Sequence, residues 1–231
     1  MSRGGGAAGL PPRILPKVVV IDAGHGGKDD GAVVYGRVEK GIVLRISQRV
    51  ADHLAGKAGI SPFLTRWSDE FVSLTDRVLR AEAVGAQAFV SIHVDNVRGR
   101  KGRGVIAYVY GRNPRIPKGP PREPGERILP PPPRSQISRS RRLAEHLGRA
   151  LRKAGIKNVR YVDRGPFAVL KSPRIPSVLI EIGNLRDRDE AAIVADPDFQ
   201  DRVARAISRS LASFVSAEQN RFARNPNSGA K

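Results

Sequence analysis

The stretch KVVVIDAGHGG at residues 17–27 sets the fold of this chain of 231 residues. Its first half is a short β-branched run, as expected of a strand that is buried on both faces of a sheet. The strand ends at Asp22, and a glycine-rich turn with His25 at its centre follows. Ligands of open α/β sheets gather beyond the carboxyl ends of the strands, so this turn is a candidate functional site.

Strands and helices alternate along the rest of the chain. Further strands are expected at 60–65, 87–93, 104–110 and 177–182, and helices at 39–56, 74–85, 138–155 and 197–217. Apolar residues recur at helical spacing in the last helix, after an initial proline, as in helices that pack on a core. This alternation predicts an α/β sheet with helices on its faces, and the length fits a single domain.

Composition excludes several classes of protein. The chain has no cysteine, which excludes disulfides, thiolate zinc sites and a cysteine nucleophile. No run approaches the roughly 18 consecutive apolar residues that a membrane-spanning helix needs. Any metal must therefore be held by histidine and carboxylate side chains.

The charge of the chain is strongly basic and unevenly distributed. The formal net charge is +19, which implies attraction to a polyanion such as nucleic acid, an anionic membrane face or a cell-wall polymer. Residues 98–142 include thirteen basic and two acidic residues and so carry +11 of this charge. Residues 111–137 hold nine of the 18 prolines, which predicts a long loop rather than a helix or strand.

The two ends of the chain differ from its middle. Residues 1–16 are predicted to form a flexible lead-in, and no secretory signal is visible in them. Residues 218–231 are predicted to form a polar tail. The folded domain is therefore expected over residues 17–217, with the loop at 111–137 inside it.

Four polar residues lie where the predicted strands and helices begin or end. They are His25 after the first strand, Glu39 at the start of the first helix, His93 at the end of a strand, and Glu181 within the apolar strand SVLIEI. Two imidazoles and one carboxylate with an open fourth position are typical of catalytic zinc. The presence of Glu181 in an apolar strand needs an explanation, because burying an unpaired carboxylate costs several kcal/mol. Beside a metal it can move a proton from water to a leaving amine, so the set favours metal-assisted amide hydrolysis.

Each candidate also has an ordinary structural explanation. His25 fits a tight glycine turn, and Glu39 fits the favourable position of an acid in the first turn of a helix. His93 fits a hydrogen-bonded core histidine, and Glu181 fits an ion pair with an arginine. The joint arrangement, rather than any one residue, supports a metal site.

Motifs of one known family are spread over residues 17–214. They are VVVIDAGHGGKDDGA, Glu39-Lys40, Leu64-Thr65-Arg66 with Asp69, Leu74 with Arg77, FVSIHVDN, and FAVLKSPRIPSVLIEIGNL. In these motifs the chain resembles the zinc-dependent N-acetylmuramoyl-L-alanine amidases of bacterial cell-wall turnover. The resemblance implies one zinc per chain, held by His25, Glu39 and His93, with Glu181 as the catalytic carboxylate. It also implies a mixed, mostly parallel open sheet with helices on both faces.

The same resemblance implies a substrate and a location. The bond cleaved would be the amide between N-acetylmuramic acid and the L-alanine of the stem peptide in peptidoglycan, in the periplasm or outside the cell. Some relatives carry a regulatory helix, and an activator protein is a candidate partner. Substrate-binding residues are not indicated. We expect the basic segment 98–142 to contact anionic wall or membrane-surface polymers, with 111–137 as a mobile flap.

Two other functions stay open on the sequence. One is a catalytically inactive wall-binding module of the same fold. The presence of all four candidate residues argues against it. The other is a basic nucleic-acid-binding protein. Aromatic residues make up only 5% of the chain, and no recognised nucleic-acid-binding motif is present, so no specific nucleic-acid partner is expected.

Overall fold

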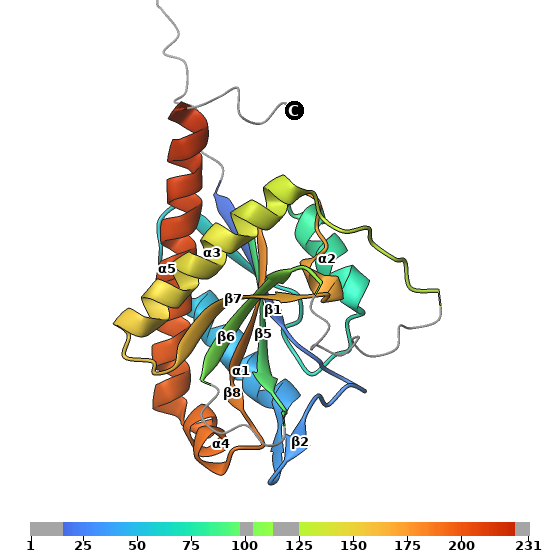
Figure 1. The fold of residues 1–231 in the computed structure, drawn as a ribbon, viewed down its shortest axis with the longest axis vertical. Coiled ribbons are helices and arrows are strands. Elements are labelled where there is room, and N and C mark those ends of the chain that lie inside the picture. Colours follow the sequence, from blue (N-terminus) through green and yellow to red (C-terminus); the bar gives the residue numbers. More distant parts are fainter. Residues whose placement is uncertain (1–15, 98–103, 113–124, 225–231) are drawn as a thin grey trace, which may run out of the picture.

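The fold is built on a six-stranded sheet. A computed structural model describes residues 16–97, 104–112 and 125–224, and its strands follow the order β4-β1-β5-β8-β6-β7 (Figure 1). The strands are β1 (Lys17–Ala23), β4 (Ile60–Leu64), β5 (Ala88–Asp95), β6 (Val105–Tyr110), β7 (Val159–Gly165) and β8 (Ser177–Asn184). Neighbouring strands are parallel except β6 and β8, which are antiparallel. The sheet is therefore mixed and mostly parallel, which confirms the expected fold class.

Helices cover both faces of the sheet (Figure 1). The larger core lies between the sheet and α1 (Glu39–Ala55), α3 (Arg134–Lys153), α4 (Arg188–Ala195) and α5 (Pro197–Arg224). The smaller core lies on the other face, under α2 (Leu74–Ala83) and the short 3₁₀ turn η1 (Ala168–Leu170). None of the described helices is long and apolar enough to cross a membrane.

The central strands are apolar on both faces because both faces are covered. In β1, Val19 and Ile21 enter the larger core, whereas Val20 enters the smaller one. This explains why the strand reads as a continuous β-branched run rather than as an alternating pattern. Asp22 occupies the next position on the face of Val20 and is fully buried, so it marks where the core gives way to polar contacts.

A small hairpin leads from the β1 turn into α1. It consists of β2 (Val33–Val34) and β3 (Arg37–Val38), which pair antiparallel. The sequence analysis did not predict this hairpin, because two-residue strands are too short to show a period of two. The hairpin sets the start of α1, whose first residue is Glu39.

Several boundaries differ from those expected. Helix α5 continues to Arg224, so residues 218–224 are helical and do not belong to the expected tail. Glu218 explains the extension, because its carboxylate accepts hydrogen bonds from Arg139 and Arg142 of α3. Helix α3 begins at Arg134 rather than at 138, so the end of the expected loop 111–137 is helical.

Besides the hairpin, one longer strand and one helix were not expected from the sequence, and some expectations fall outside the described residues. The sequence analysis predicted neither β7 nor α4. Residues 1–15 of the lead-in expected at 1–16, residues 98–103, residues 113–124 of the proline-rich loop and residues 225–231 of the expected tail lie outside the described part of the chain.

Candidate metal centre

Three of the four candidate residues meet beyond the carboxyl ends of the parallel strands. His25 lies in the turn after β1, Glu39 begins α1, and His93 lies near the end of β5. His25 Nε2 lies 3.1 Å from Glu39 Oε1 and 3.1 Å from His93 Nδ1. His93 Nδ1 lies 3.2 Å from Glu39 Oε1, which closes a triangle of two nitrogens and one oxygen.

The triangle has the dimensions and chemistry of a zinc site. With bonds of about 2.0–2.1 Å, the ligand atoms of a tetrahedral zinc are separated by roughly 3.3 Å. The three separations of 3.1–3.2 Å are close to that value. The side chains of His25 and His93 remain 20% and 17% exposed, so a fourth ligand can approach from solvent. The residues present therefore fit a zinc ion with an open fourth position.

Glu39 is held in the charged form that ligation requires. Its Oε2 accepts a hydrogen bond from the N–H of Ala32 at 2.9 Å, and its Oε1 accepts one from the N–H of Val94 at 3.0 Å. Burial raises the pKa of this carboxyl, but hydrogen bonds and charge from His25 and His93 outweigh burial and hold the pKa well below its usual range. The carboxylate is therefore ionised at neutral pH.

His25 has an unusual backbone and a carboxylate partner. Its φ is 59°, in the left-handed region that residues other than glycine uncommonly adopt. Its Nδ1 lies 2.9 Å from Asp29 Oδ2, which orients the ring. Burial lowers the pKa of His25, but hydrogen bonds to Asp29 and Glu39 raise it overall to about 10. The sequence analysis gave Asp29 no role, although it lies inside the quoted motif.

Two glycines make room for the cluster. A Cβ added at Gly24 would lie 2.3 Å from Cε1 of His93, which is far inside van der Waals contact. A Cβ added at Gly31 would lie 2.7 Å from Oε2 of Glu39, and its φ of 65° also favours glycine. The glycines of this segment therefore permit the close approach of His93 and Glu39.

Two buried arginines hold the β1 turn in place. Arg77 of α2 donates hydrogen bonds to the carbonyl oxygens of Ala23 and His25, both at 2.6 Å. Arg66 donates to the carbonyl oxygens of Ala23 at 2.9 Å and Gly24 at 2.7 Å. These bonds fix the backbone that carries His25. Both arginines lie in the motifs quoted above, but their contacts could not be read from the sequence.

Asp22 provides the counter-charge of Arg77. It forms an ion pair with Arg77 at 2.8 Å and accepts hydrogen bonds from the hydroxyls of Thr65 and Ser91. Burial raises the pKa of Asp22, but the charge of Arg77 and these hydrogen bonds hold it below its usual range. Asp22 thus links β1 with α2 and β5 directly beneath the cluster.

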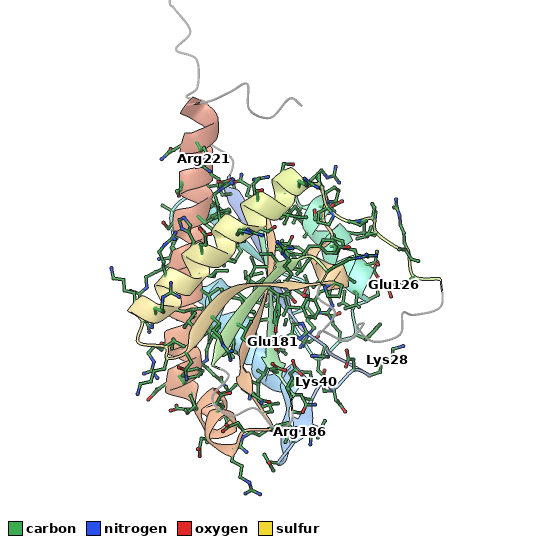
Figure 2. All side chains as sticks on the ribbon, in the orientation of Figure 1. Lys28, Lys40, Glu126, Glu181, Arg186 and Arg221 are labelled. Carbon is green, nitrogen blue, oxygen red and sulfur yellow. The ribbon has the colours of Figure 1, made fainter. Side chains whose placement is uncertain are left out.

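Lys40 fastens the outer part of the turn. Its Nζ lies 2.8 Å from Asp30 Oδ1 and 2.9 Å from Asp69 Oδ2, and it donates a hydrogen bond to the carbonyl of Gly27. Lys40 and Glu181 lie at the same end of the sheet (Figure 2). Asp30 and Asp69 therefore pair with Lys40 and are not part of the group of potential metal ligands.

Glu181 lies beside the cluster on the next strand. Its Cα is the register partner of His93 across the parallel pair β5–β8, so both side chains leave the same face of the sheet. Among the described residues, the compact group of potential metal ligands consists of His25, Glu39 and His93 and does not include Glu181. The fourth candidate is therefore adjacent to the triangle but distinct from it.

A mixed α/β sheet with two imidazoles and a carboxylate beyond its carboxyl edge is typical of a metal-dependent hydrolase. The family model of the N-acetylmuramoyl-L-alanine amidases, Amidase_3, matches residues 19–213. The chain belongs to this family, whose members are generally zinc-dependent.

Individual relatives agree with the family match. The chain is 30% identical to the N-acetylmuramoyl-L-alanine amidase AmiA of Escherichia coli K12, with 86% of this chain and 76% of that protein covered. It is 32% identical to the endolysin of Bacillus phage SPP1, with 89% and 68% covered. The solved N-acetylmuramoyl-L-alanine amidase AmiC2 of Nostoc punctiforme has a TM-score of 0.68 at 33% identity, with 87% and 97% covered.

Proposed function

We propose that this amidase cleaves the bond between N-acetylmuramic acid and L-alanine of peptidoglycan with one zinc held by His25, Glu39 and His93. The observation that carries this proposal is the triangle of ligand atoms at 3.1–3.2 Å. Zinc supplies Lewis acidity, which polarises a carbonyl and lowers the pKa of a water molecule. Two of the three residues are also held from outside the triangle, Glu39 by the N–H groups of Ala32 and Val94 and His25 by Asp29.

Glu181 is proposed to carry the proton through the reaction. Its carboxylate takes a proton from the attacking water, whose oxygen bonds to the lactyl carbonyl carbon. The same carboxyl then gives the proton to the amide nitrogen as the C–N bond breaks. The products are a carboxylate on the sugar and a free amino group on L-alanine. The register of Glu181 with His93 supports this role, because it places the carboxylate beside the cluster without making it part of it.

The two alternatives from the sequence are less well supported. A catalytically inactive wall-binding module has no need for two arginines and an aspartate that fix the His25 turn. The match to the amidase model over residues 19–213 also favours a peptidoglycan enzyme over a nucleic-acid-binding protein.

We also propose a setting for the enzyme. One relative, LytH of Staphylococcus aureus at 26% identity, is named a probable cell wall amidase, which supports a periplasmic or extracellular location. One neighbour in structure, the CwlD amidase of Clostridioides difficile, was solved in complex with the GerS lipoprotein. It is 23% identical to this chain, and it motivates a search for an accessory protein here. The proposed catalytic unit begins at residue 17, with its last helix running beyond the expected end at 217.

Metal content and product release test the proposal together. The wild-type protein should hold about one zinc per chain by mass spectrometry and release stem peptides from purified sacculi. His93→Ala should lose most of its zinc, whereas the matched control His53→Ala should keep it, because His53 contacts Asp201 between α1 and α5 instead. Full zinc content and normal turnover in His93→Ala would exclude His93 from the site. Zinc-loaded protein that releases no stem peptide would refute the proposed reaction.

A further inference from the structure

A groove on the edge of the sheet opposite the metal centre gathers four arginines. It lies between the first half of α3 and the ends of β6 and β7, and its volume is about 480 Å³. The charged residues that line it are Arg134, Arg141, Arg142, Arg164 and Glu145. Arg134 and Arg141 make no hydrogen bond or ion pair with any described residue, so their guanidinium groups can bind a ligand.

One face of α3 provides most of the groove. Arg134, Ile137, Ser138 and Arg141 line it and follow the three- and four-residue spacing of a single helix face. Arg134 and Arg141 are seven residues apart, which places them about 10 Å apart along the helix axis. A single phosphate or carboxylate is too small to contact both. A polymer with repeated anionic groups can contact both at once.

Arg164 provides the opposite wall. Its Cα is the register partner of Val109 of β6. Its side-chain stem lies against Gly111, where an added Cβ would be 3.0 Å from both Cβ and Cδ of Arg164. The absence of a side chain at residue 111 therefore lets the stem of Arg164 lie close to the backbone beside the groove.

Arg142 contributes differently from the other three arginines. Its Nη2 lies 3.1 Å from Oε1 of Glu218 in α5, and Glu218 also accepts a hydrogen bond from Arg139. Arg142 is therefore committed to holding α3 against α5. The guanidinium groups that remain for a ligand are those of Arg134 and Arg141, and Arg164 lines the groove across from them.

The groove is separate from the metal centre. Strand β6 runs antiparallel to β8, so it starts near Glu181, where Ile106 is the register partner of that residue, and it runs away from the cluster. Tyr110 lies four residues after Ile106 in β6, so the two residues are about 13 Å apart along the strand at 3.3 Å per residue. The first turn of α3 and the β2–β3 hairpin accordingly lie at opposite ends of the sheet (Figure 1).

We propose that this groove binds consecutive phosphate groups of an anionic cell-wall polymer, a linear phosphodiester-linked polyol. Arginine suits this ligand, because its planar guanidinium pairs with two phosphate oxygens at once. Single-stranded nucleic acid is disfavoured, because its binding sites stack bases on several aromatic side chains, and among the described residues only one aromatic side chain, that of Tyr110, lines this groove. The choice of a wall polymer rests on the proposed function, which places the enzyme on peptidoglycan.

Two variants of equal charge change test the assignment. Arg134→Gln/Arg141→Gln/Arg164→Gln removes three charges from the groove. The control Arg149→Gln/Lys153→Gln/Lys157→Gln removes three exposed charges at and beyond the other end of α3. The probe is poly(glycerol phosphate), and its dissociation constant is measured by calorimetry at 50 and 200 mM NaCl. The groove variant should bind at least tenfold more weakly at 50 mM and show a shallower salt dependence, and the control should stay within twofold of wild type.

The outcomes separate this proposal from the proposed reaction. Equal weakening in both variants would mean that bulk charge alone binds the polymer, which would overturn the groove. Duplex DNA with the same number of phosphates that binds the wild type as tightly as the polymer would overturn the choice of ligand. Hydrolysis of a soluble muropeptide should be unchanged in the groove variant, which would support two separate sites. Failure of the wild type to hydrolyse that muropeptide would refute the reaction and leave the binding result standing.

Discussion

His93 and Glu181 are register partners on the neighbouring parallel strands β5 and β8, and their side chains leave the same face of the sheet. One belongs to the cluster of potential metal ligands, and the other lies next to it. This relationship places the proposed proton carrier and a potential metal ligand on two rigid strands rather than on loops, so their separation is fixed by the strand pairing itself.

Replacing Glu181 by Gln should separate metal binding from turnover. The amide preserves the shape of the side chain but cannot accept the proton, so kcat should fall by about 10²–10⁴. Zinc content should stay near that of the wild type. Loss of zinc in Glu181→Gln, measured by mass spectrometry of the purified protein, would make Glu181 a ligand instead.

Gly24→Ala should disturb the metal site through packing alone. The new Cβ would overlap Cε1 of His93, so the imidazole must move away from the other ligands. Zinc affinity should fall at least tenfold, as measured by competition with a chromogenic chelator. Gly56→Ala is the matched control, because nothing lies within 4 Å of a Cβ there and its φ is −75°. Equal affinity in the two variants would contradict this view of Gly24.

Asp29→Asn should weaken zinc binding without removing a ligand. Asp29 orients His25 through Nδ1, and loss of such a partner typically costs 10–100-fold in metal affinity. The adjacent Asp30 pairs with Lys40 instead, so Asp30→Asn should change zinc affinity by less than threefold. An effect of Asp30→Asn as large as that of Asp29→Asn would show that loop charge, rather than orientation of the ring, governs affinity.

Zinc binding should release a proton from His25. In the metal-free protein the pKa of His25 is raised to about 10, so its imidazole is protonated at pH 7.5. A ligating nitrogen must lose that proton, and apparent zinc affinity should therefore rise about tenfold per pH unit between pH 6.5 and 8.5. Calorimetry in two buffers of different ionisation enthalpy should report about one proton released per zinc. Affinity that does not change with pH would contradict a protonated His25.

Asp22→Asn should lower stability and remove part of its acid dependence. Breaking one side of a buried ion pair costs about 3–5 kcal/mol, here because Arg77 loses its counter-charge. The pKa of Asp22 is below its usual range in the folded state, so its contribution is present above the unfolded pKa of about 3.9 and lost as pH falls through the folded value.

Urea unfolding at pH 7 and between pH 5 and 3 checks this prediction. The gap in free energy of unfolding between wild type and Asp22→Asn should be largest at pH 7 and should shrink as Asp22 is protonated. Asp52→Asn, which changes an exposed aspartate of α1, should lie within about 0.5 kcal/mol of wild type throughout. A gap that stays constant down to pH 3 would show that the charge of Asp22 is not the stabilising feature.

The sequence was most informative where a polar residue interrupts an apolar run. His93 and Glu181 stand out for this reason, and parallel topology then predicts that residues after β1 and in β5 come together. The contacts of Asp22 with Arg77 could not be predicted, because the two residues are 55 positions apart and no local period encodes a cross-sheet ion pair.

The missed elements have a different cause. Strand β7 pairs with a neighbour on one side only, and its sequence VRYVDRG mixes three charged residues with apolar ones, unlike the buried strands. The start of α3 was placed late because four consecutive prolines precede it, although proline is well tolerated just before a helix. Local sequence rules therefore identified the strands buried on both faces and the edge strand β4, but not the edge strand β7.

The reversed direction of β6 has a mechanical consequence for an enzyme that works on an insoluble mesh. A tether at the groove would hold the molecule by one end while the catalytic end faces away from the attachment point. The tether would raise the local concentration of cleavable bonds without occupying the metal centre, and the reach of each anchored molecule would be limited to about its own length.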